Sequence, residues 1–247
     1  ATPSSLVSRL ARATAVAEVR WLEAKQESNF ALFAPHLEEV IALTRDKAQI
    51  LSQALGLSPY DALIDGFSPG FLSAEIEQLF RVVSRRLPSL IRDAIELQAE
   101  RPPLPITGKV STAKQRSLAV DVMRALGFPF DRGRLDESDH PFTEGVNGDV
   151  RVTTRFVPHE PFTGLMGVLH ETGQAMYDLG LPEAWRDQPV GRDRGMALEE
   201  SQSLLLEMII GRSRPFLAYL RPLLEKHFGV TGPEWEPDNL YRTLIRV

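Results

Sequence analysis

Val168-Leu169-His170-Glu171-Thr172-Gly173-Gln174-Ala175-Met176 is the stretch around which the rest of the chain is organised. His170 and Gln174 are four residues apart, so on a helix they lie on one face, one above the other. Glu171 follows the histidine directly. In the HExxH motif, two histidines at this spacing bind zinc and the glutamate is the general base. Gln174 takes the place of the second histidine, so the stretch resembles the motif but is broken at one metal ligand, and the rest of the chain must show whether the chemistry is restored or lost.

The composition is that of an ordinary globular protein. Of the 247 residues, 43% are hydrophobic and 25% are charged, and the net charge is -5. This mild acidity gives no reason to expect nucleic acid or an anionic membrane as a partner. The chain has no cysteine, which excludes disulfides and thiolate metal sites and agrees with a cytoplasmic location. No apolar run reaches the roughly 18 residues of a membrane span.

Apolar residues recur at helical spacing over most of the chain. The patterns predict helices within 5–26, 37–55, 73–87, 90–97, 112–126, 160–179, 196–210 and 215–228, and a last one from about 233. Pro88 is expected to break or restart the third of these, because proline removes a helical hydrogen bond. Arg101-Pro102-Pro103-Leu104-Pro105 is the clearest predicted linker.

Residues 132–158 differ from their surroundings. Turn residues flank the β-branched run 150–156, which predicts a strand and, with its neighbours, a hairpin. The fold class is therefore mainly α, a multi-helix fold with one small β-hairpin or sheet near residues 134–157. We expect a single domain over 1–247, helical in 1–130, with the β element at 132–158 and the helices of the candidate site at 160–247.

A second polar group lies on a later predicted helix, where Glu199-Glu200-Ser201-Gln202 interrupts an apolar stretch. A carboxylate from a second helix is the usual third ligand of a His-His-Glu zinc site. The residues alone leave three interpretations open. They are a metal site, a hydrogen-bonded histidine without metal, and a metal-free pair of carboxylates formed by Glu171 with Glu199 or Glu200.

Further strings complete the pattern, in a consistent order. They are Tyr60-Asp61-Ala62-Leu63 with Pro69-Gly70, His140-Pro141-Phe142, Asp149-Val150-Arg151-Val152-Thr153, Met166 to Gly173, Gln188-Pro189-Val190-Gly191, Glu200-Ser201-Gln202-Ser203 and Gly211-Arg212-Ser213. Over most of residues 29–247 their order and spacing resemble the carboxypeptidase Taq family of zinc metallocarboxypeptidases. The resemblance implies a helical enzyme with a deep groove, a homodimer that removes single residues from peptide C-termini.

The resemblance also implies roles for individual residues. His170 and Glu200 fall on the first and third zinc ligands, Gln174 falls on the second, and Glu171 falls on the general base that takes a proton from metal-activated water. Four further positions match residues that line the family's substrate groove, namely His140, Asp149, Arg151 and Thr153. A structural role for Asp149 and Arg151, in which they pin the hairpin against the helices, is an equal alternative.

The chain departs from the family pattern at the metal. Gln174 replaces a zinc histidine, and Glu199 replaces the histidine that precedes the ligand glutamate. A glutamine oxygen is a poorer zinc ligand than imidazole, and Glu199 joins the set only if the local geometry cooperates. The remaining ligands are mostly oxygen atoms, which suit a harder ion such as Mn²⁺ or Mg²⁺ better than zinc. A site that binds no metal is the other alternative.

The family's later motifs, IRxxAD and GxxQDxHW, have no counterpart before Val247. We therefore expect the chain to cover the middle part of a longer fold. Two hypotheses follow for its function. One is a metallocarboxypeptidase with an altered metal site, and the other is a catalytically impaired homologue whose groove binds peptides or a protein.

Overall fold

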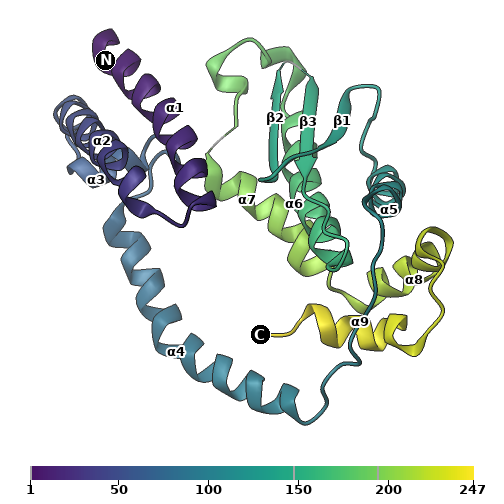
Figure 1. Cartoon of the computed structure of the whole chain (residues 1–247). Helices are drawn as coiled ribbons and strands as arrows, with labels where there is room; N and C mark the ends of the chain where they lie inside the picture. Colours follow the sequence, from purple (N-terminus) through teal and green to yellow (C-terminus); the bar gives the residue numbers. More distant parts are fainter. Residues whose placement is uncertain (1, 147, 194) are drawn as a thin grey trace. The chain divides into compact units, whose positions relative to one another are not determined.

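The computed structural model describes residues 2–146, 148–193 and 195–247. It confirms the predicted class, a mainly helical fold with one small sheet (Figure 1). The α-helices are α1 Ser4–Gln26, α2 Ala34–Leu55, α3 Pro59–Ile64, α4 Ser73–Ala99, α5 Thr112–Ala125, α6 Pro161–Leu179, α7 Met196–Leu204, α8 Arg214–Phe228 and α9 Pro237–Leu244. The strands are β1 Gly133–Glu137, β2 Phe142–Val146 and β3 Asp149–Thr154.

The chain forms two compact units, Ala1–Val82 and Val83–Val247. The first unit contains α1, α2 and α3. Its small core joins α1 to α2 through Leu6, Ala13 and Leu43. Gly56, with φ +70°, ends α2, and Ser58 caps α3 by accepting a hydrogen bond from the Asp61 amide. Within the described residues, no helix of either unit is both long and apolar enough to cross a membrane.

Helix α4 continues through Pro88, so the predicted break at this residue is wrong. Proline removes one amide donor from the ladder, and the turns on either side carry the helix past it. The Ser89 hydroxyl donates to the Arg86 carbonyl at 2.9 Å, which satisfies an acceptor in this turn. None of the α4 side chains is buried.

The sheet has the strand order β1-β3-β2. Strands β2 and β3 form the predicted antiparallel hairpin, with Thr143 opposite Val152. Strand β1 adds a parallel neighbour that was not predicted, pairing Leu135 with Val152. Both of these side chains are fully buried. The sheet therefore presents one apolar face to the second unit's core.

Helix α6 is the centre of the second unit. It is apolar around most of its circumference, as expected for an inner helix. One side packs on α5 and α8 in a cluster that includes Leu118, Leu165, Leu169, Leu217, Leu220 and Leu224. The other side packs on the sheet through Val168 and Ala175. The residues between these two faces are held in fixed positions, and the candidate site lies there.

Helix α7 crosses α6 at very short range. A Cβ atom on Gly173 would lie 2.6 Å from both the Gln202 carbonyl oxygen and the Ser203 Cα. Glycine at this position therefore allows the α7 backbone to lie directly against α6. After Leu204 the helix widens into a π-helical segment, η4 Leu205–Ile210, where a regular α-helix was expected.

Candidate active site

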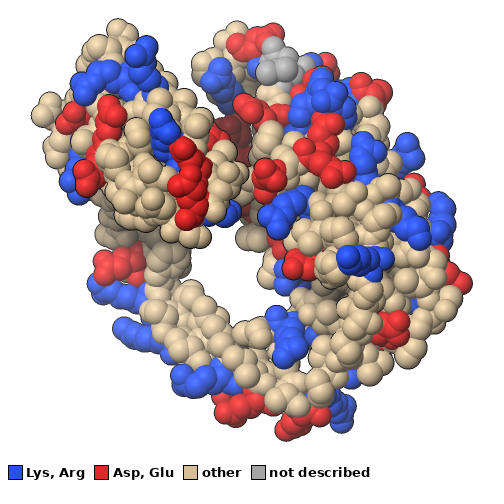
Figure 2. Space-filling model, viewed as in Figure 1, with Lys and Arg blue, Asp and Glu red and all other residues tan. Residues whose placement is uncertain are grey.

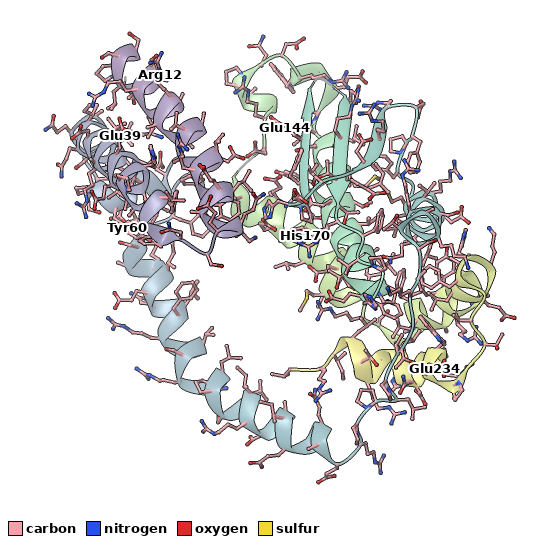
Figure 3. The ribbon with its side chains drawn as sticks, viewed as in Figure 1. Arg12, Glu39, Tyr60, Glu144, His170 and Glu234 are labelled. Atoms are coloured by element: carbon pink, nitrogen blue, oxygen red, sulfur yellow. The ribbon has the colours of Figure 1, made fainter. Side chains whose placement is uncertain are left out.

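A cavity of about 820 Å³ opens beside the middle of α6 in the second unit. Its lining includes His140 and Thr143 from the sheet side, and His170, Glu171, Gln174, Glu200, Glu207 and Arg212 from the helices. Figure 3 shows His170 on α6, with Glu144 on the neighbouring strand β2. Acidic and basic side chains are mixed over the visible face of the described surface (Figure 2).

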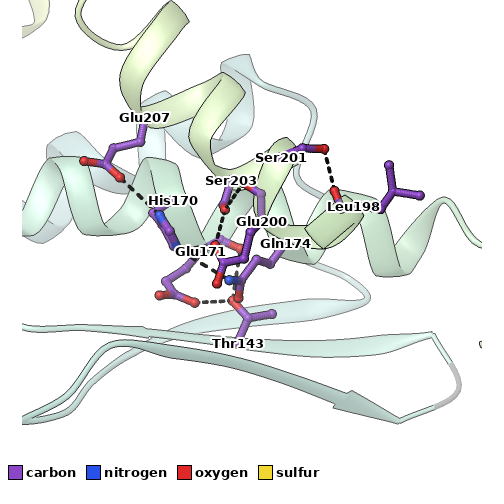
Figure 4. Close-up of polar contacts among 9 residues, drawn as sticks. All are labelled: Thr143, His170, Glu171, Gln174, Leu198, Glu200, Ser201, Ser203 and Glu207. Atoms are coloured by element: carbon purple, nitrogen blue, oxygen red, sulfur yellow. Dashed lines mark hydrogen bonds and ion pairs between the residues drawn. The ribbon is translucent and has the colours of Figure 1, made fainter. Parts of the chain in front are cut away.

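His170 is held from two sides (Figure 4). Its Nδ1 lies 3.1 Å from Glu207 Oε2, and a carboxylate only accepts, so Nδ1 carries a hydrogen. Its Nε2 lies 3.3 Å from Glu200 Oε2 and 3.3 Å from the Gln174 amide nitrogen. Arg212 donates to the second oxygen of Glu207 at 2.7 Å. The imidazole is thereby oriented with Nε2 toward Glu200 and Gln174.

Glu171 is a buried carboxylate at the same cavity, with 6% of its surface exposed. Thr143 Oγ lies 2.7 Å from Glu171 Oε2. Burial raises the pKa of Glu171, while the hydrogen bond from Thr143 and the charge of His170 lower it in part. The charge of Glu200 raises this pKa further. A carboxylate with a raised pKa that faces a cavity suits a general base or acid.

Glu200 and Glu199 have different environments although they are neighbours. Ser203 donates to Glu200 Oε2 at 2.7 Å, which helps to orient that carboxylate toward His170. Glu199 is absent from the cavity lining. Burial, followed by the charges of Asp178 and Asp193, raises the pKa of Glu199. The charges of Glu200 and Glu171 raise the pKa of Glu199 as well, so Glu199 lies near these carboxylates although it does not line the cavity.

Of the four residues assigned to the groove by resemblance, His140 lines the cavity. Asp149 and Arg151 form a two-point ion pair at 2.6 Å along β3, and hydrogen bonds from Arg151 lower the pKa of Asp149. Thr153 is buried, lies 2.8 Å from Ser138 Oγ and accepts from the Phe142 amide at 3.0 Å. Asp149 and Arg151 thus pair with each other on one strand, with half-exposed side chains, and Thr153 links β3 to β2. A role of these three residues in the groove stays a prediction.

Three residues of the site were not singled out from the sequence, namely Thr143, Glu207 and the side chain of Arg212. Glu207 carried a usable signal, because it is a lone acid within the apolar run 204–210. An acid in such a run needs a buried partner. Thr143 carried no comparable signal, since its role depends on how the hairpin packs against α6.

The residues around His170 Nε2 determine whether a metal ion fits. Among the described residues, no three His, Asp or Glu side chains come together as a metal-binding group. The third ligand of an ion would have to be the Gln174 side-chain amide. A 180° rotation of this amide group puts its oxygen where its nitrogen lies now. Two ligands of a tetrahedral ion lie about 3.3 Å apart, as do His170 Nε2 and its two neighbours. The set fits a divalent ion with two strong ligands and one weak one.

A sequence profile of the carboxypeptidase Taq (M32) metallopeptidases matches residues 1–247. The chain belongs to this family. Its members are metallocarboxypeptidases, so the family predicted from the sequence is confirmed. Two relatives bear this out. A thermostable carboxypeptidase 1 from Thermus thermophilus is 36% identical over 241 residues, and a carboxypeptidase 1 from Bacillus subtilis is 38% identical over 202 residues.

The solved structure of Trypanosoma cruzi metallocarboxypeptidase 1 has the same fold. It aligns with a TM-score of 0.89 and 36% identity over 99% of this chain. The match covers 49% of the trypanosome chain, 47% of the Thermus relative and 40% of the Bacillus relative. The chain therefore spans about half the length of the proteins it matches.

Proposed function

We propose that this chain provides the catalytic cavity of a peptidase that removes single residues from the C-termini of peptides. The observation that carries the proposal is Glu171, a buried carboxylate with a raised pKa beside His170. The family supports the reaction class. Thr143 holds the Glu171 carboxylate in place, and a base of this kind contributes about 10²- to 10⁴-fold to a rate.

His170, Glu200 and Gln174 are the residues that would hold a divalent ion, which we propose is zinc or a harder ion such as Mn²⁺. A bound ion would supply a more acidic water and would polarise the scissile carbonyl. Glu171 takes a proton in the cavity and returns it to the leaving amine. Glu207 and Arg212 keep His170 in one orientation. We further propose, on the family resemblance, a homodimer in the cytoplasm.

A second candidate function is peptide binding without hydrolysis. The observation that favours it is the donor set, in which a neutral amide takes the place of the third strong ligand and Glu199 does not line the cavity. An ion held by two strong ligands and an amide binds weakly. Such a cavity can still bind a peptide while it no longer hydrolyses the peptide bond.

One experiment separates the two candidates. The chain and its Gln174→His, Glu199→His variant are titrated with Zn²⁺ and Mn²⁺ by calorimetry and assayed on a peptide with a free C-terminus. The amidated peptide is the control, since a carboxypeptidase does not trim it. We expect the variant to bind metal more tightly and to trim only the free peptide, and Glu171→Gln to lower trimming at least about 100-fold. Tight metal binding in the variant, with peptide bound and never trimmed, would instead support the second candidate.

A further inference from the structure

A second cavity of about 470 Å³ lies in the same unit, between Gly145, Gly148 and Val150 of the hairpin and the C-terminal end of α6. It shares no lining residue with the cavity at His170. The two are close in the fold, because Asp178 in the second cavity lies one helical turn after Gln174 in the first. Gly145 in the second cavity lies two residues after Thr143 on β2.

Two arginines converge on one point of this cavity. Gly148 has φ +91° and no side chain, and a Cβ built there would lie 3.1 Å from Arg132 Nη2 and 3.4 Å from Arg186 Nη1. Arg132 Nε donates to the Gly148 carbonyl at 3.2 Å, and within the described part of the chain Arg132 makes no ion pair with a carboxylate. Arg186 pairs at 3.3 Å with Glu183, whose side chain is 83% exposed, and exposed pairs of this kind are weak. Two guanidinium groups in this arrangement favour an anion between them, above all a carboxylate.

The same cavity also contains carboxylates, which would bind a cation. Asp178 is half-buried, and neither lysine nor arginine lies in ion-pair range of it among the described residues. Burial, and then the charge of Asp193, raises the pKa of Asp178. The Gly195 amide donates to Asp193 at 2.9 Å, which fixes that carboxylate. Asp178 is half-buried and Asp193 is exposed, and a cationic group between the two carboxylates would neutralise both.

Val150, Leu179 and Leu181 give the cavity an apolar wall, and Asp187 and Arg192 add one further charge of each sign to the lining. The cavity thus combines an anion-binding part, a cation-binding part and an apolar wall within about 470 Å³. An inorganic anion would bind Arg132 and Arg186 but not Asp178 and Asp193, and a metal cation would bind these acids but not the arginines. A small molecule that carries both charges satisfies both parts.

We propose that this cavity binds a free α-amino acid with an apolar side chain, its carboxylate on Arg132 and Arg186 and its ammonium on Asp178 and Asp193. The site is separate from the peptidase cavity, and its occupancy is measured without any activity. A peptidase that releases single residues produces molecules of this class. An occupant would touch the same strand and helix that carry Thr143 and Gln174.

The test is a calorimetric titration of the whole chain with L-leucine, N-acetyl-L-leucine, L-leucinamide and inorganic phosphate. The acetyl compound lacks the ammonium, and the amide lacks the carboxylate. We expect L-leucine to bind at one site per chain, and each of the other three to bind at least about tenfold more weakly, the loss expected for one charged contact.

Two variants assign the ends of the ligand. Arg186→Gln should weaken L-leucine and N-acetyl-L-leucine about tenfold or more and leave L-leucinamide unchanged. Asp178→Asn should weaken L-leucine and L-leucinamide and leave N-acetyl-L-leucine unchanged. Arg155→Gln removes an exposed arginine outside the cavity and is the matched control, expected to bind as the unmodified chain does. Thermal melting establishes that each variant is folded.

The proposal is overturned if L-leucine does not bind, or if phosphate binds as tightly as L-leucine. It is also overturned if folded Arg186→Gln and Asp178→Asn proteins bind L-leucine unchanged. If either variant does not fold, the four ligands on the unmodified chain decide the question alone. His170→Ala should leave L-leucine binding intact, and loss of binding there would place the amino acid in the first cavity and refute the proposal. Failure of the proposed hydrolysis would alter none of these results.

Discussion

Replacing Glu207 with alanine should weaken divalent-metal binding at His170 by about 10- to 100-fold. Glu207 Oε2 lies 3.1 Å from His170 Nδ1 and keeps the hydrogen on that nitrogen, which leaves Nε2 free to act as a ligand. Removal of a carboxylate behind a metal-binding histidine typically has this effect, and the range corresponds to about 1.4–2.7 kcal/mol. Glu207→Gln keeps an acceptor for Nδ1 and loses the charge, so its effect should be smaller.

The assay is titration calorimetry with Zn²⁺ and with Mn²⁺, in the natural chain and in the Gln174→His variant. The Gln174→His variant is included because its second imidazole should raise the affinity for the metal ion, so that a loss of affinity is easier to measure. A readout that needs no metal is the ¹⁵N spectrum of the imidazole, where Glu207→Ala should increase the tautomer with hydrogen on Nε2. Glu225→Ala removes an acid whose side chain is 59% exposed, and it is the control. A folded Glu207→Ala protein with less than a twofold change in affinity and an unaltered tautomer would refute the reasoning.

Three further outcomes are expected, each measured by unfolding. Burial raises the pKa of Glu171 above its ordinary value of 4.5, so the folded state loses stability as the pH rises through that raised pKa. Glu171→Gln should therefore be more stable than the natural chain at pH 8 and equal to it below pH 4.5, and an unchanged difference between these pH values would contradict this. Leu220→Ala should cost about 2–5 kcal/mol, because Leu220 is fully buried in the main core; a cost under 1 kcal/mol would show that the core closes over the space. Asn239→Ala should cost about 3 kcal/mol, because Asn239 bonds both the amide and the carbonyl of Leu104, whereas exposed Tyr60→Ala should cost little.

The helices and the central part of the site could be predicted from the sequence because both depend on local spacing. His170 and Gln174 are four residues apart, and any helix brings them together. The approach of Glu200 to His170 depended on resemblance to the family, since nothing in the spacing of α6 and α7 specifies how they cross. The lone acid Glu207 indicated a buried partner, but the sequence could not identify His170 as that partner, because the contact depends on the packing of η4 against α6.

The sheet shows a second limit of local patterns. The hairpin of β2 and β3 was predicted because its strands are neighbours in sequence. Strand β1 pairs in parallel with β3, beyond the intervening strand, and only Leu135 of its five residues is buried. A single buried residue between charged neighbours gives too weak an alternation to identify a strand. Pro88 shows the reverse case, in which a strong local signal was overridden by the helical turns around it.

Gly173 has a consequence that reaches beyond the packing of two helices. It sets the distance between α6 and α7, and with it the distance between His170 and Glu200. The spacing of two candidate ligands therefore depends on a residue that has no side chain. A methyl group there would separate α7 from α6 and lengthen the distance from Glu200 to His170, while His170 and Gln174, both on α6, would keep their spacing. Screens that vary only ionisable residues would overlook it. Any design that restores an imidazole at position 174 inherits this spacer, and it succeeds only while position 173 remains glycine.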